Sequence, residues 1–264
     1  MLSPPAPRLN IADTLRIITR VWWHEFASVT LLGFLLVLLP DVVLALAFGP
    51  AAGGIGGGDD GTIVWTVLGV CLMLYGAAVA FGIVVGLRDG QLRPGAFVTA
   101  GLAAAKPGLL TALVLGTAAL LVSVPFALDD RIGSHGLLPM VSLALLLFGT
   151  AALLPAVPAA VAERLAPIDA LKRAAELTRG HRSRLAGLLL VLALGLLPPI
   201  GLIQLVMFGP HATPDSAFKL QENWTFVEPR LWIGFLSDLL FAGLAACVPP
   251  VVYSELVRLR QAGR

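Results

Sequence analysis

Long apolar runs alternate with short polar segments along nearly the whole chain. Each run has 20 or more residues and is rich in Leu, Ala, Val and Gly; the runs are 28–48, 62–87, 106–128, 136–162, 184–209 and 231–253. A helix rises about 1.5 Å per residue, so each run is long enough to cross a hydrocarbon core of about 30 Å. The runs are continuous, whereas the strands of a membrane β-barrel alternate. The pattern predicts an all-α integral membrane protein with six transmembrane helices arranged as three hairpins.

Amphipathic segments precede three of these runs. The segment 11–26 carries its apolar residues on one helical face, with Trp22 and Trp23 near its end. Such a pattern is typical of a helix in the membrane interface, with the indoles at headgroup depth. The segments 94–108 and 167–182 stand in comparable positions. We expect cytoplasmic interfacial helices before spans 1 and 5, and the stretch before span 3 is a weaker candidate.

The three openings, which start near residues 11, 94 and 167, suggest a threefold repeat of one helix plus one hairpin. Composition alone also produces such similarity. Prolines recur inside the spans, where each one removes a backbone hydrogen bond and predicts a kink. Those singled out are Pro40, Pro125, Pro155, Pro158, Pro198, Pro199, Pro249 and Pro250. Two interpretations stay open: kinks that shape packing, or unwound segments that line a cavity.

The chain divides into a tail and one membrane domain. Residues 1–10 are Pro-rich and polar, which predicts a short disordered tail, and residues 11–264 leave no stretch for a sizeable soluble domain. The sequence Ala45-Leu46-Ala47 has the small-residue spacing of a signal-peptide cleavage site. The apolar run before it is too long and begins too late for a typical signal, so we expect the first span to be retained.

Charge is sparse and unevenly placed. The 264 residues are 58% hydrophobic and 13% charged, and the formal net charge is +2. Fifteen of the 18 Lys and Arg residues lie in the N-terminal segment, the 88–106 loop, the 163–184 loop and the C-terminal tail. Positive residues near span ends stay on the cytoplasmic side, so both termini are expected in the cytoplasm. With a composition rich in Ala, Gly, Arg and Leu, this indicates a bacterial cytoplasmic (inner) membrane.

The segment 166–192, APIDALKRAAELTRGHRSRLAGLLLVL, carries the most informative motif. The motif comprises Ala170, Leu171, Arg173, Glu176, Leu177, Thr178, Arg179, Gly180 and His181. It resembles the signature of the glycerophosphoryl diester phosphodiesterase membrane-domain family, which are bacterial six-helix membrane proteins. Ala174 and Ala175 depart from the family's pattern. The resemblance implies a membrane module of uncertain activity, related to lipids, anchoring or assembly, and the chain has no soluble barrel that could act as a phosphodiesterase.

The same segment predicts a short surface helix. Pro167 suits its first turn, Asp169 favours its positive end and Gly180 suits its stop. Its basic residues are candidates for contact with anionic lipid or a partner: Lys172, Arg173, Arg179, His181, Arg182 and Arg184. Either a nonspecific surface helix that fixes topology or a specific lipid-phosphate or partner site is compatible with this cluster.

Asp41 and Asp238 stand inside or near apolar spans. A carboxylate in hydrocarbon is costly and tends to mark a pathway or a buried partner. Both residues are expected in the outer part of the membrane. An interfacial, hydrogen-bonded role and a shared polar cavity both remain open.

No other residues form a recognisable chemical site. The four histidines are scattered, the two cysteines lie in different spans, and the Gly-rich loop 49–61 lacks the Lys-Ser/Thr of a phosphate-binding loop. We expect no catalytic residues, no metal and no cofactor. The loop 210–230 is expected outside the membrane, either dipping aromatic residues into the interface or contacting a partner.

Three classes of function follow. A structural, scaffolding or lipid-interacting module agrees best with the missing catalytic residues and the small-residue-rich spans. A secondary transporter or channel that uses Asp41 and Asp238 is the alternative. An enzyme acting on lipid headgroups is the weakest of the three. The expected partners are the phospholipid bilayer and either anionic lipids or another membrane protein, and nucleic acid is not among them.

Overall fold

The computed structural model describes residues 9–48, 58–90, 94–132, 137–209 and 229–262, and their regular structure is helical. Six helical segments are long and apolar enough to cross a membrane: Phe26–Phe48, Ile63–Asp89, Pro94–Val124, Met140–Glu163, Arg182–Met207 and Trp232–Ala262. Each overlaps one of the six predicted runs. The prediction of an all-α chain with six such helices is therefore confirmed.

The first span is a helix with a widened turn. It consists of α2 (Phe26–Gly33), the π-helix η1 (Phe34–Leu38) and α3 (Leu39–Phe48). Pro40 has no backbone N–H and cannot bond to a carbonyl in the preceding turn. In that turn the Leu39 N–H bonds to the carbonyl of Phe34, five residues back. The wide turn thus directly precedes the proline.

A separate helix, α1 (Ile11–His24), lies before this span. The Asn10 side chain caps it by accepting a bond from the Ala12 N–H at 3.1 Å. Leu9 is buried in the core. An apolar contact and a cap thus order Leu9 and Asn10, the last two residues of the predicted tail. Residues 1–8 lie outside the described part of the chain.

The remaining helices are α4 (Gly58–Asp89), α5 (Pro94–Ile132), α6 (Leu137–Leu153), α7 (Ala156–Glu163), α8 (Pro167–Leu177), α9 (Arg182–Phe208) and α11 (Pro229–Ala262). In α5 the segment before the third span continues into the span without a break. The fourth span is interrupted at Pro155, between α6 and α7. The proline pairs of α9 and α11 lie inside continuous helices.

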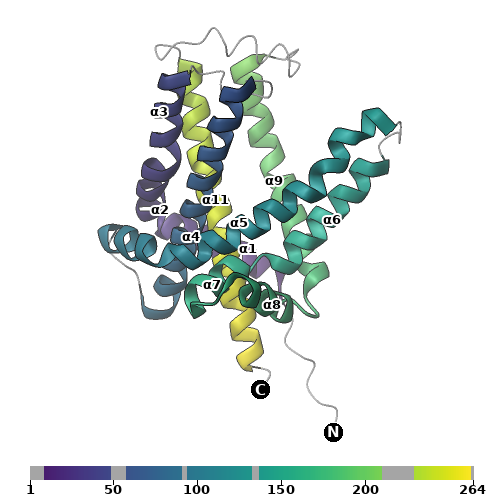
Figure 1. The fold of residues 1–264 in the computed structure, drawn as a ribbon. Coiled ribbons are helices and arrows are strands. Elements are labelled where there is room, and N and C mark those ends of the chain that lie inside the picture. Colours follow the sequence, from purple (N-terminus) through teal and green to yellow (C-terminus); the bar gives the residue numbers. More distant parts are fainter. Residues whose placement is uncertain (1–8, 49–57, 91–93, 133–136, 210–228, 263–264) are drawn as a thin grey trace.

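The helices gather around α4 and α11. The apolar windows of these two spans are 39% and 44% buried, against 22% or less in the other four. α4 packs against α5, α7 and α11, and α11 also packs against α1. In Figure 1 the last turns of α11 lie at the same end of the molecule as α7 and α8, while α3 and the first turns of α4 and α11 lie at the opposite end. The last turns of α5 and the first turns of α6 lean away from the other helices, while α5 also packs against α4 and α6 against α9.

Candidate ligand-binding site

A cavity of about 760 Å³ lies between the first span, α4 and α11, with Met207 of α9 at its side. One stripe of each helix lines it. The stripe of the first span is Val37, Asp41, Leu44 and Ala45; that of α4 is Val64, Trp65, Leu68, Gly69, Leu72, Tyr75 and Gly76; that of α11 is Gly234, Phe235, Asp238, Phe241, Ala242, Ala245 and Ala246. The stripe on α4 covers about 18 Å along its axis, at about 1.5 Å per residue. The cavity is therefore elongated along the helices.

Asp41 and Asp238 both line this cavity. Asp41 belongs to the first turn of α3, directly after Pro40 and the π-helix. Asp238 lies on α11, beside the buried Ser237, whose hydroxyl donates to the carbonyl of Gly234 at 2.7 Å. The two carboxylates are close enough for their charges to interact. The structure thus joins two residues that stand 197 positions apart in the chain.

Small residues leave open space in the part of the cavity wall that α4 forms. A Cβ atom on Gly69 or Gly76 would meet nothing within 4 Å. Trp65 and Leu72 line the cavity and are also 56% and 49% exposed. The cavity therefore opens to the surroundings beside α4.

Four aromatic residues complete the lining. The rings belong to Trp65, Tyr75, Phe235 and Phe241. Tyr75 is fully buried, and its hydroxyl lies 3.4 Å from the Val29 carbonyl, to which it donates. The sequence did not single out Tyr75, because a tyrosine among apolar residues is an ordinary core residue until its neighbours are known.

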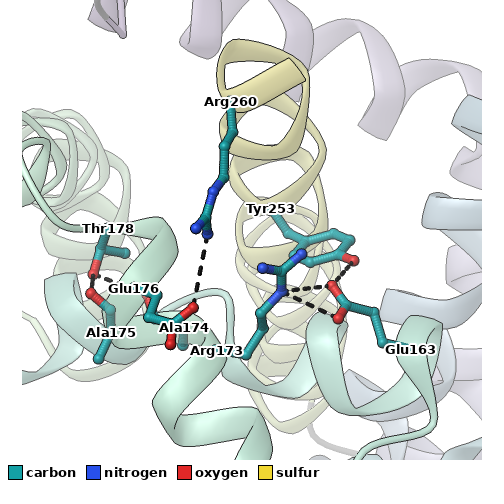
Figure 2. A network of polar contacts seen from close by, with 8 residues as sticks. All are labelled: Glu163, Arg173, Ala174, Ala175, Glu176, Thr178, Tyr253 and Arg260. Carbon is teal, nitrogen blue, oxygen red and sulfur yellow. Dashed lines mark hydrogen bonds and ion pairs between the residues drawn. The ribbon is translucent and has the colours of Figure 1, made fainter. Parts of the chain in front are cut away.

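The six basic residues that were predicted to contact anionic lipid or a partner do not form one surface. Arg173 turns inward: its Nε donates to both carboxylate oxygens of Glu163, at 3.0 and 3.1 Å. The hydroxyl of Tyr253 donates to Glu163 Oε1 at 2.8 Å. Glu163 thus joins α7, α8 and α11 (Figure 2). A second, longer ion pair links α11 to α8, with Arg260 Nη1 3.8 Å from Glu176 Oε2.

Arg184 is also used inside the protein. Its Nη1 donates to the backbone carbonyl of Leu9 at 2.8 Å, which fastens the segment before α1 to α9. Arg179 and Arg182 are exposed, and Lys172 makes an exposed ion pair with Asp169 at 3.7 Å. The surface part of the predicted cluster is therefore Lys172, Arg179 and Arg182.

His181 is half-buried, and its Nδ1 atom has no hydrogen-bond partner among the described residues. Burial lowers the pKa of His181, and the nearby Arg184 lowers it further. The imidazole is thus a poor cation for binding phosphate. As expected, α8 begins at Pro167, and Gly180 takes a positive φ of 86° after its end.

Glu25 is a further buried carboxylate that the sequence did not mark. It occupies the turn between α1 and α2 and is only 5% exposed. Its Oε2 atom has no hydrogen-bond partner among the described residues. In the sequence Glu25 directly follows Trp-Trp-His, in the segment predicted to lie at the membrane interface, where an exposed carboxylate is common. In the folded protein it is buried and lies beside Gly86 of α4.

Within the described part of the chain, no group of three or more His, Cys, Asp or Glu side chains could hold a metal ion. His135 and His211 lie outside it, as do most of the 49–61 and 210–230 loops. The cavity walls offer two carboxylates, four aromatic rings and otherwise mostly apolar side chains. Such walls suit a molecule that is largely apolar and carries positive charge.

The fold and the cavity define an α-helical chain with six potential membrane spans and a cavity between them. Comparisons with known protein families, with characterised proteins and with solved structures found no significant match. The resemblance of segment 166–192 to the glycerophosphoryl diester phosphodiesterase membrane-domain family rests on the residues quoted above and stays a prediction.

Proposed function

We propose that this chain is a lipid-interacting membrane module that binds an elongated amphiphile with a cationic head group inside the membrane. The observation that carries this proposal is the position of Asp41 and Asp238 in one otherwise mostly apolar cavity of about 760 Å³. Ionisable groups within membrane spans are costly and commonly mark binding sites or pathways. Two carboxylates whose charges interact repel each other, and a bound cation relieves that repulsion.

The rest of the lining supports the same class of ligand. Cations bind over aromatic faces with about 0.5–2 kcal/mol, and quaternary ammonium groups are bound in this way. The elongated shape matches a hydrocarbon chain, and the opening beside α4 gives a route from the surrounding lipid. We place the head group near Asp41 and Asp238 and the chain along the stripes of α4 and α11.

We place the protein in a bacterial inner membrane, as three hairpins, with α1, α8 and both termini at the cytoplasmic face. The Lys and Arg bias supports this orientation. Trp22 and Trp23 pack with Phe26 at the start of the first span, as an aromatic belt would. The exposed Lys172, Arg179 and Arg182 would then face anionic lipid headgroups. A scaffolding role stays a prediction.

Binding can be tested with two single-chain probes of equal length, dodecyltrimethylammonium and dodecanoate. The protein is released from lipid nanodiscs in a mass spectrometer, and the bound probe is counted. We expect retention of dodecyltrimethylammonium over dodecanoate. Asp41→Asn with Asp238→Asn should weaken its binding at least tenfold, which corresponds to about 1.4 kcal/mol.

Cavity filling supplies a second variant. Gly69→Leu places a side chain into the open space, so it should exclude both probes. Gly195→Leu on α9 is the matched control, because its Cβ also meets nothing within 4 Å and Gly195 does not line the cavity. Equal retention of the two probes, or unchanged binding in the double aspartate variant, would refute the proposed ligand class.

A further inference from the structure

The cavity occupies one half of the three spans that line it. On the first span the lining lies within residues 37–45, in the half that ends at Phe48. On α4 and α11 it lies within residues 64–76 and 234–246, in the first half of each span. These halves lie at the end of the molecule opposite α7 and α8 (Figure 1). The stripes on α4 and α11 are each about 18 Å long, close to half of a hydrocarbon core of about 30 Å.

Close packing ends the cavity on the side of α7 and α8. Tyr75 is fully buried there, and its hydroxyl donates to the Val29 carbonyl at 3.4 Å. A Cβ atom on Gly243 of α11 would lie 3.3 Å from Val29 Cγ1 and 3.5 Å from the Tyr75 hydroxyl oxygen. Residues 77–80 of α4, which follow the lining residue Gly76, are at most 1% exposed. The cavity therefore has a closed end, formed by three packed helices near the middle of the spans.

The side of the cavity is open. Four of its lining residues are exposed, two on α4 and two on α11: Trp65, Leu72, Asp238 and Ala245. The members of each pair are seven positions apart, which corresponds to about 10 Å along a helix. The exposed edge thus extends along the helices, as the sideways entry of an extended hydrocarbon chain requires.

The two carboxylates give the cavity a direction. Asp238 follows Trp232, the first residue of its span, by about 9 Å of helix, and Asp41 precedes Phe48, the last residue of its span, by about 10 Å. Beyond Asp238 the lining of α11 is apolar as far as the closed end. A cationic head group at the carboxylates, with its chain toward the closed end, points from the membrane surface to the membrane centre. A lipid of the adjoining leaflet lies in the same direction.

We propose that the cavity takes its ligand sideways from the outer leaflet and holds it there, closed toward the cytoplasmic leaflet. This inference rests on the proposed function and on the proposed orientation, which places the end with α3 outside. An amphiphile of the outer leaflet enters without turning over. One from the cytoplasmic leaflet would have to carry its charged head group across the hydrocarbon core, which is costly. The chain then acts as a receptor for cationic amphiphiles of the outer leaflet rather than as a channel.

Two photoreactive forms of dodecyltrimethylammonium test the direction of the bound ligand. One carries a diazirine at the terminal carbon of the chain, and the other carries it beside the ammonium group. The full chain is illuminated with each probe in nanodiscs, and the labelled residues are identified by mass spectrometry. The terminal diazirine should label Tyr75, Gly76 or Ala246, and the diazirine beside the head group should label Asp41 or Trp65. The reverse assignment would overturn the proposed direction, whereas no labelling of the cavity by either probe would remove the proposed function as well.

Membranes of opposite sidedness test the source of the ligand. Spheroplasts of a bacterial host expose the outer face of the inner membrane, and inverted vesicles expose the cytoplasmic face. The terminal-diazirine probe is added briefly, because its permanent charge slows its passage across the hydrocarbon core. Labelling should be at least about tenfold stronger in spheroplasts, and equal once both preparations are opened by freezing and thawing. Equal or stronger labelling in intact inverted vesicles would overturn the leaflet assignment and leave the proposed ligand class intact.

A substitution at the closed end tests the same direction without photochemistry. Gly76→Leu fills space where an added Cβ meets nothing within 4 Å. It should lower the retention of dodecyltrimethylammonium relative to hexyltrimethylammonium at least about fivefold, or about 1 kcal/mol, because the longer chain extends further toward that end. Gly149→Leu on α6 is the matched control, since its Cβ also meets nothing within 4 Å and Gly149 does not line the cavity. An unchanged ratio in Gly76→Leu would contradict a chain that points toward the closed end.

Discussion

Single side chains decide how α7, α8 and α11 are joined. Glu163 accepts hydrogen bonds from Arg173 and Tyr253, so one carboxylate holds three helices together (Figure 2). In the ion pair between Arg173 and Glu163, the two side chains are 31% and 29% exposed. A partly desolvated, hydrogen-bonded charge contributes more to stability than an exposed pair. Arg173 therefore makes a structural contact within the protein.

This junction yields a prediction about stability. Glu163→Gln should lower the free energy of unfolding by about 1–3 kcal/mol, because it removes the charge that Arg173 and Tyr253 both contact. Thermal unfolding in detergent or nanodiscs measures the effect as a fall of several degrees in Tm. Asp169→Asn is the control, since its ion pair with Lys172 is exposed and should change Tm little. Equal shifts for the two variants would contradict the assigned role.

At the scale of elements, glycines let α4 and α5 approach closely. A Cβ atom on Gly101 would lie 2.8 Å from the Ala78 carbonyl oxygen, and one on Gly108 would lie 2.8 Å from the Ala77 Cβ. Close backbone approach through small residues is a common way for membrane helices to associate. The small residues that suggested contact with a partner are thus used, on these two helices, for internal packing.

A pair of alanine substitutions separates packing from helix propensity. Gly→Ala in a helix normally stabilises by up to about 1 kcal/mol. Gly195→Ala on α9, where the added Cβ meets nothing, should raise Tm or leave it unchanged. Gly101→Ala should lower it, because the obstructing Ala78 atom belongs to the backbone and overpacking costs about 1–3 kcal/mol. A stabilised Gly101→Ala variant would show that α4 and α5 are not held this closely.

At the scale of the whole molecule, the orientation in the membrane is open to a direct test. With 15 of 18 basic residues on one predicted side, we expect a green fluorescent protein fused after Arg264 to fluoresce in a bacterial host. Alkaline phosphatase fused at the same place should be inactive, since it needs the oxidising periplasm. The same fusions after Gly209 should give the opposite result. Active phosphatase at the C-terminus would reverse the proposed orientation.

Much of the element inventory was predictable from the sequence. Apolar runs of membrane length are continuous in the chain, so six helices could be placed without knowing their neighbours. The effect of a proline on a helix could not be predicted in the same way. Helix α5 runs unbroken through Pro107, whereas the fourth span is interrupted at Pro155. Whether a helix tolerates a proline depends on the contacts on either side of it, which local sequence does not contain.

The sequence by itself determined that the chain has six apolar segments long enough to span a membrane. It also singled out the two aspartates within or near them. Only the tertiary structure decided that Asp41 and Asp238 share a cavity, that Arg173 and Arg184 bind within the protein, and that Glu25 is buried. The physical reason lies in the range of each property. Hydropathy and length are local sums along the chain, whereas a cavity or a buried charge exists only where helices distant in sequence pack together.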